Sequence, residues 1–114
     1  MPKRENELLV QDLIDSFTNI LDYTKGVSFD DFVENRMMKD AVIRNFKIIG
    51  EAANLLTEEF KSDNPQVEWR RLTDFRNKLI HHYFGLSYNI IWETIQNEAQ
   101  EHLDFLETIE FENS

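Results

Sequence analysis

The chain has 114 residues, no cysteine and a formal net charge of −10 at pH 7. This length suits one domain around a single hydrophobic core, and the lack of cysteine excludes disulfide frameworks, thiolate nucleophiles and cysteine-ligated zinc. No apolar run approaches a membrane span, and the first residues lack the apolar core of a signal peptide, so we expect a cytoplasmic protein without a membrane partner.

The charge is unevenly distributed along the chain. Residues 61–85 hold five basic and three acidic side chains, whereas residues 86–114 hold seven acidic and no basic ones. So acidic a chain is not expected to hold nucleic acid by bulk electrostatics. The net-positive segment could still provide a local patch for a phosphate backbone, formed by Arg70, Arg71, Arg76 and Lys78.

Hydrophobic periodicity predicts helices in the first half of the chain. Residues 5–23 repeat apolar side chains at steps of three and four, and Gly26 offers a left-handed cap behind them. Ser28 is a candidate N-cap for a short helix that ends near Asn35. A long third helix is expected over residues 36–60. Its small Gly50 would let another helix approach closely, which would offset the cost of glycine in a helix interior.

The second half predicts two more helices. Pro65 marks the clearest break, and the next helix is expected from Val67 to Gly85. Ser87 is a candidate N-cap for a last helix that reaches about Phe111. Short connections between amphipathic helices favour an all-α fold, an antiparallel up-and-down bundle of four main helices plus one short helix. The expected core comprises Leu9, Leu13, Phe17, Ile20, Met38, Ala41, Val42, Ile49, Ala52, Ala53, Leu56, Phe60, Ile91, Ile95, His102, Leu106 and Ile109.

Residues 76–83, Arg-Asn-Lys-Leu-Ile-His-His-Tyr, hold the most informative polar side chains. At about 100° per residue, Arg76, Asn77, His81 and Tyr83 share one broad side of a helix, beside an apolar stripe. Arginine offers a planar fork of donors to a phosphate, and histidine readily moves a proton near neutral pH. The pair suits phosphodiester chemistry, although a short Arg-x4-His pattern by itself also fits a solvated helix flank.

The wider sequence context resembles a known family. Arg-Asn-x-x-x-His-x-Tyr followed by Phe-Gly resembles the R-x4-6-H signature of the HEPN superfamily, in the form found in HepT-like toxins. Residues 40–44, Asp-Ala-Val-Ile-Arg, and residues 48–53, Ile-Ile-Gly-Glu-Ala-Ala, are similar to a second helix of that family. Residues 90–92, Ile-Ile-Trp, are a third match. The resemblance covers nearly the whole chain and implies a single HEPN (HepT-like) helical domain over residues 1–114.

The resemblance implies a metal-independent endoribonuclease toxin, without a cofactor, that belongs to a type VII-like toxin–antitoxin pair. RNA supplies its own nucleophile, so the protein need only move a proton and hold the phosphate. Arg76 would clamp the phosphate and His81 would be the general base or acid, with Asn77, Lys78 and Tyr83 supporting substrate binding. HEPN-type proteins are typically homodimers whose two motifs face a shared cleft, which would supply a second histidine.

Tyr83 has a second implied role. In HepT-like pairs, an MntA-like nucleotidyltransferase antitoxin adds AMP to the tyrosine of the motif, so the resemblance makes Tyr83 the AMPylation acceptor. The added phosphate would lie against Arg76 and block the substrate site by charge and bulk. Tyr83 could instead simply complete the apolar edge of its helix. The acidic charge also leaves open a catalytically silent helical binding module that pairs with a nucleotidyltransferase-like partner.

Three other side chains have simpler interpretations. His82 is expected to be a surface residue, and His102 a hydrogen-bonded histidine on the inner side of the last helix. His102 with Glu98 could bind a metal in principle, but two candidate ligands are weak evidence and we expect no metal site. Trp69, with Tyr83, is expected to be exposed beside the polar side of the motif helix, as part of a partner surface.

Overall fold

The computed structural model describes residues 3–81 and 88–111, without the side chains of residues 3–4 and 77–81, and the regular elements of this part are all helices. The prediction of an all-α fold is therefore confirmed. The elements are α1 (Lys3–Thr24), α2 (Phe29–Glu34), α3 (Arg36–Leu55), α4 (Glu58–Asp63), α5 (Trp69–His81), α6 (Tyr88–Thr94), the π-helical turn η1 (Ile95–Ala99) and α7 (Gln100–Glu107). No helix in the described ranges is both long and apolar enough to cross a membrane.

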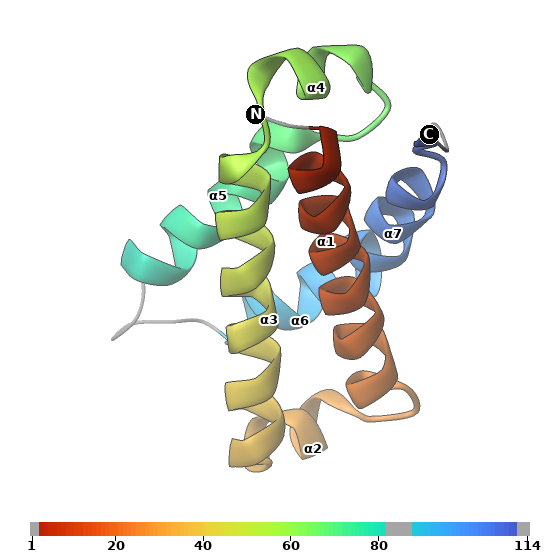
Figure 1. Ribbon diagram of the computed structural model, residues 1–114. Coiled ribbons are helices and arrows are strands. Elements are labelled where there is room, and N and C mark those ends of the chain that lie inside the picture. Colours follow the sequence, from red (N-terminus) through yellow and green to blue (C-terminus); the bar gives the residue numbers. More distant parts are fainter. Residues whose placement is uncertain (1–2, 82–87, 112–114) are drawn as a thin grey trace.

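Four long elements form the bundle. Helices α1 and α3 lie side by side and run in opposite directions, and α5 packs across α3 (Figure 1). The segment formed by α6, η1 and α7 packs against α1. The short helices α2 and α4 lie at opposite ends of the molecule (Figure 1). The expected bundle of four main helices is confirmed, with two short helices in place of one.

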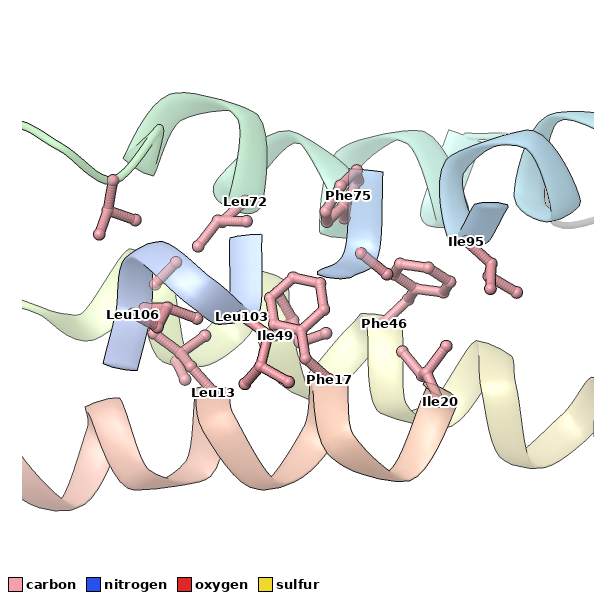
Figure 2. Close-up of a cluster of buried hydrophobic side chains, with 14 of the residues drawn as sticks. Leu13, Phe17, Ile20, Phe46, Ile49, Leu72, Phe75, Ile95, Leu103 and Leu106 are labelled. Carbon is pink, nitrogen blue, oxygen red and sulfur yellow. The ribbon is translucent and has the colours of Figure 1, made fainter. Parts of the chain in front are cut away.

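The core lies where these helices meet, and the expected inward faces supply it. Figure 2 shows side chains from α1, α3, α5 and α7 converging on one cluster. The largest fully buried side chains are Leu13, Phe17, Ile20, Phe32, Val42, Ile49, Leu72 and Leu106. Burying one such side chain contributes about 1.5–3 kcal/mol. The expected core residues Leu9, Met38, Ala41, Phe60 and Ile109 are only half-buried at its margin.

The predicted third helix is shorter than expected. It ends at Leu55, because Leu56 has an extended backbone and Thr57 starts the separate helix α4. The Thr57 hydroxyl accepts a hydrogen bond from the backbone N–H of Phe60 at 3.1 Å, which is the geometry of an N-cap. Asn6 of α1 donates its amide to the same hydroxyl at 3.4 Å. The two hydrogen bonds of Thr57 therefore end the helix at a point where the apolar periodicity alone would continue it.

The predicted last helix is interrupted, although its expected path is largely correct. Residues 95–99 form a π-helical turn between α6 and α7, and α7 ends at Glu107 rather than near Phe111. Such a turn adds a residue to the helix and changes which side chains face inward after it. Ser28 does cap α2, since its hydroxyl accepts from the Asp31 N–H at 3.1 Å, and Gly26 has the left-handed φ of 71° expected behind α1.

Candidate active site

Helix α5 carries the motif, and the structure describes it up to His81. It begins at Trp69, two residues later than predicted. Asn77, Lys78 and His81 belong to this helix, but their side chains lie outside the described part. Tyr83, His82 and the predicted helix end at Gly85 also lie outside it. The geometry of the site therefore rests on Arg76 and on the elements that hold α5.

Arg76 lies where α5 crosses α3 at very short range. A Cβ atom built on Gly50 of α3 would meet the Cβ, backbone N and Cα of Arg76 at 2.3, 2.6 and 2.8 Å. Real Cβ atoms do not come this close to other atoms, so any side chain at position 50 would push the two helices apart. The prediction that Gly50 serves close helix packing is confirmed. Its partner in that contact is the arginine of the motif.

The Arg76 side chain is half-buried and keeps unused hydrogen-bonding capacity. Its Nε is screened from water, with less than 1 Å² exposed, and has no hydrogen-bond partner among the residues that the structure describes. A buried donor without an acceptor usually costs about 1–3 kcal/mol. An atom this shielded is out of reach of a substrate unless its neighbours move, so an anion would have to be bound through another part of the half-buried guanidinium.

Aromatic packing fixes the inner side of the same crossing. Phe75 of α5 and Phe46 of α3 are buried and meet edge to face, with their ring centroids 5.2 Å apart. Figure 2 shows both rings within the core cluster. Such pairs contribute about 0.5–1.5 kcal/mol beyond the burial of their area. Gly50 and Phe46 lie one turn apart on α3, so they hold α5 at two neighbouring points, Arg76 and Phe75.

A partly buried ionic network ties α5 to the C-terminal segment. Arg71 Nε and Nη2 donate to the two carboxylate oxygens of Glu98 at 2.8 and 2.5 Å. Glu98 Oε1 also lies 3.2 Å from Nε2 of His102, which is only 4% exposed. The rings of Phe17 and Phe75 flank that histidine, with centroids 5.6 and 6.0 Å away. Glu98 belongs to the π-helical turn η1.

The network shifts the protonation equilibria of its members. Hydrogen bonding to Arg71 lowers the pKa of Glu98, and the contact with His102 lowers it further, while burial opposes both effects. The hydrogen bond to Glu98 raises the pKa of Arg71. Glu98 is therefore ionised over the neutral range, and the pair carries a full charge on each side. Two parallel N–H···O bonds of this kind are the strongest arrangement for such a pair.

Two predictions about this region are wrong. Arg71 does not join a phosphate patch with Arg76, because it turns to Glu98 and its guanidinium lies 5.0 Å from the ring centre of Phe75. Trp69 is not an exposed partner surface. It is 8% exposed, packs on Phe60 and donates its Nε1–H to the Asn64 carbonyl at 2.9 Å. The position of Arg71 four residues before Phe75 was the sequence signal for an inward-facing arginine.

The interpretation of His102 as a core histidine is confirmed. Its Nε2 faces Glu98, but both oxygens of that carboxylate are already engaged by Arg71. Within the residues that the structure describes, no group of three or more histidine and carboxylate side chains could hold a metal ion. The network ties α5 to the C-terminal segment through Arg71 and Glu98.

Comparisons with known proteins decide the family. The family model described as "Ribonuclease HepT-like" matches residues 13–109. The chain belongs to the HepT-like ribonuclease family. It is 38% identical to a Methanocaldococcus jannaschii protein provisionally named as an RNase, over 96% of this chain and 90% of that protein. No solved structure matches the chain.

Two further relatives agree with this HepT-like assignment. A Caldanaerobacter subterraneus protein, also provisionally named as an RNase, is 44% identical over 72% of this chain and 73% of its own length. A Thermococcus cleftensis protein named as a probable ribonuclease HepT is 33% identical over 84% of this chain and 87% of its own. The match to the HepT-like family confirms the resemblance seen in the sequence and covers the Gly50–Arg76 crossing.

Proposed function

We propose that this HepT-like protein is a metal-independent endoribonuclease whose catalytic residues are Arg76 and His81. The observation that carries the proposal is the half-buried Arg76 side chain, held at the Gly50 crossing, whose shielded Nε has no acceptor within the described part of the chain. Membership in a ribonuclease family supports a phosphodiester as the ligand of that arginine. A phosphate oxygen would bind the part of the guanidinium that stays exposed.

The chemistry needs a proton transfer and a clamp on the phosphate. A general base removes the proton of the 2′-hydroxyl, the oxygen attacks the adjacent phosphorus, and the P–O5′ bond breaks as a proton reaches the leaving oxygen. In our proposal, Arg76 holds the phosphate in line and stabilises the charge that develops on its oxygens. His81 moves the protons. Asn77, Lys78 and Tyr83 support it by orienting His81 or by contacting the phosphate.

We propose a homodimer as the active unit, because base and acid are needed on opposite sides of the phosphorus. A single histidine cannot easily serve both positions in one geometry. The histidine of a second copy would fill the other position if the two motifs faced one cleft. Expected support is a dimer in analytical ultracentrifugation and loss of activity in mixed dimers that carry one His81→Ala subunit.

We further propose that the chain is the toxin of a type VII-like toxin–antitoxin pair. An MntA-like nucleotidyltransferase would transfer AMP from ATP to the Tyr83 hydroxyl, forming a phosphodiester and releasing pyrophosphate. The new phosphate would compete with RNA for Arg76. Co-expression with such an enzyme should add the mass of one or more AMP units to the peptide that contains Tyr83. A Tyr83→Phe variant that is still modified on that peptide would contradict the assignment.

The nuclease proposal has a direct test. The purified protein should cut single-stranded RNA in the presence of EDTA, and both Arg76→Ala and His81→Ala should abolish cutting while keeping the far-UV circular dichroism of the wild type. Arg36→Ala is the matched control, because Arg36 is an exposed arginine at the far end of α3 from the crossing. Loss of activity in EDTA would contradict metal independence. Full activity in both variants would contradict the assignment of catalysis to Arg76 and His81. No cutting by the wild type would favour the silent binding module.

A further inference from the structure

A groove lies beside the Arg76 crossing, between the end of α3, helix α4 and the first turns of α5. Its volume is about 430 Å³, and its lining includes Asn54, Glu58, Lys61, Arg70, Thr73 and Asp74. Pockets of roughly 300–1,000 Å³ are the size that binds small molecules, and a nucleotide falls within that class. The groove is therefore large enough for one nucleotide of an RNA strand.

On each of the two helices, the groove begins one helical turn from the Gly50–Arg76 crossing. Asn54 follows Gly50 by four residues on α3, and Thr73 precedes Arg76 by three residues on α5. One turn of helix is about 5.4 Å. A nucleotide bound in the groove would thus be the immediate neighbour of a phosphate held by Arg76.

The polar lining matches what a nucleotide offers. Arg70 is exposed, and Lys61 makes only a loose ion pair of 3.6 Å with Glu58, whose side chain is 93% exposed and free to turn away. Arg70 can therefore meet a phosphate at the surface, whereas Lys61, whose side chain is 14% exposed, can meet one only within the groove that it lines. The hydroxyl of Thr73, the amide of Asn54 and the carboxylate of Asp74 supply the donor and acceptor atoms that base edges recognise.

The same lining argues against a second copy of this chain as the occupant. The buried centre of a protein–protein interface is depleted of charged side chains and enriched in aromatic ones. Four of the groove's side chains are charged, and its one aromatic side chain, Trp69, is only 8% exposed. The composition is that of a site for a charged, hydrogen-bonding ligand.

We propose that this groove is a subsite for the nucleotide next to the scissile phosphate, with Arg70 and Lys61 on the flanking phosphate and Asp74 on the base. The inference rests on the proposed nuclease function, since RNA is taken as the substrate. It adds a binding site to that function and makes Asp74 a determinant of base preference. A carboxylate accepts hydrogen bonds, so it selects bases that present an amino group.

RNA binding is the first test, and it does not depend on cutting. The probe is a fluorescein-labelled single-stranded RNA of mixed sequence, and the protein carries His81→Ala so that the probe stays intact. Adding Arg70→Ala should weaken binding about tenfold, the loss of one charge-assisted hydrogen bond. It should also reduce the slope of log affinity against log salt by about 0.7. Arg36→Ala, the same change at the far end of α3, should alter neither quantity by as much.

RNA cleavage by variants that keep His81 distinguishes failure of this inference from failure of the proposed function. Arg70→Ala should raise KM for an oligonucleotide with little change in kcat, and Asp74→Asn should change which base flanks the cut. If the wild type cuts RNA and both variants match it in affinity, KM and cut sites, the groove is not a subsite. Equal losses in Arg70→Ala and Arg36→Ala, or a change of oligomeric state in Arg70→Ala, would also overturn it.

Discussion

Gly50→Ala tests whether the helix crossing at Arg76 is as tight as the structure has it. The added methyl group would lie 2.3 to 2.8 Å from atoms of Arg76, two of them backbone atoms that cannot rotate away. Reaching an ordinary contact of 3.4 Å requires α3 and α5 to separate by about 1 Å. Overpacking of this kind costs about 1–3 kcal/mol, and because the backbone itself must move we expect a value near the upper end.

Helix propensity acts in the opposite direction and must be subtracted. Alanine is favoured over glycine in a helix interior by about 1 kcal/mol, so the net destabilisation should be about 2 kcal/mol. For a domain of this size, that corresponds to a melting temperature lower by roughly 8 °C. The propensity term can be measured in the same helix by comparing Lys47→Ala with Lys47→Gly, because Lys47 is exposed on α3.

Activity should fall further than stability in Gly50→Ala. A displacement of about 1 Å at a group that binds the reacting phosphate can cost roughly a hundredfold in rate. The assays are urea unfolding and RNA cleavage well below the new melting temperature, so that only folded protein is compared. If Gly50→Ala is stabilised by the amount that the Lys47 pair measures and retains full activity, the close contact with Arg76 is refuted.

The remaining predictions concern the tie to the C-terminal segment and two helix ends. Glu98→Gln, which removes the charge beside Arg71, should destabilise the fold by about 1–3 kcal/mol in urea unfolding. The pKa of Glu98 in the folded state lies below its ordinary value of 4.5, so the stability that its charge contributes is present above pH 4.5 and is lost as the pH falls through the folded-state pKa. The stabilities of the wild type and of Glu98→Gln should therefore converge in acid. Gly26→Ala should cost about 1 kcal/mol through its φ of 71° alone, because nothing lies within 4 Å of the added methyl group, and an unchanged melting temperature would contradict this. Asn35→Ala should cost about 1 kcal/mol in the same assay, because the Asn35 side chain caps α3 by accepting from the N–H of Met38 at 2.9 Å.

Features that depend on local chemistry were predictable from the sequence. The caps at Ser28 and Gly26 and the inward faces of α1 and α3 follow from a few neighbouring residues, and the structure confirms them. The packing role of Gly50 was also predictable, because glycine in a helix interior needs a reason. The sequence could not identify Arg76 as the residue that meets Gly50, because that contact depends on how α5 crosses α3.

Features that depend on contacts between distant segments were not predictable. The break at Leu56 results from Thr57, whose hydroxyl is held by Asn6 from the start of the chain as well as by its own helix. The π-helical turn brings Glu98 to Arg71 and thereby removes Arg71 from the expected basic patch. In each case a polar side chain found a partner far along the sequence, which periodicity cannot reveal.

Two independent contacts fix α5, one at the motif arginine and one five residues before it. Gly50 sets its distance from α3 at Arg76, and Glu98 holds Arg71, five residues earlier, to the C-terminal segment. A catalytic arginine must be placed within a fraction of an ångström, yet its own guanidinium must stay free for the substrate. The contacts of Gly50 and Glu98 meet both demands, since neither of them uses the Arg76 guanidinium as a hydrogen-bond donor. In the nuclease that we propose, changes at Gly50 or Glu98 should therefore lower activity by displacing Arg76, beyond their effect on stability.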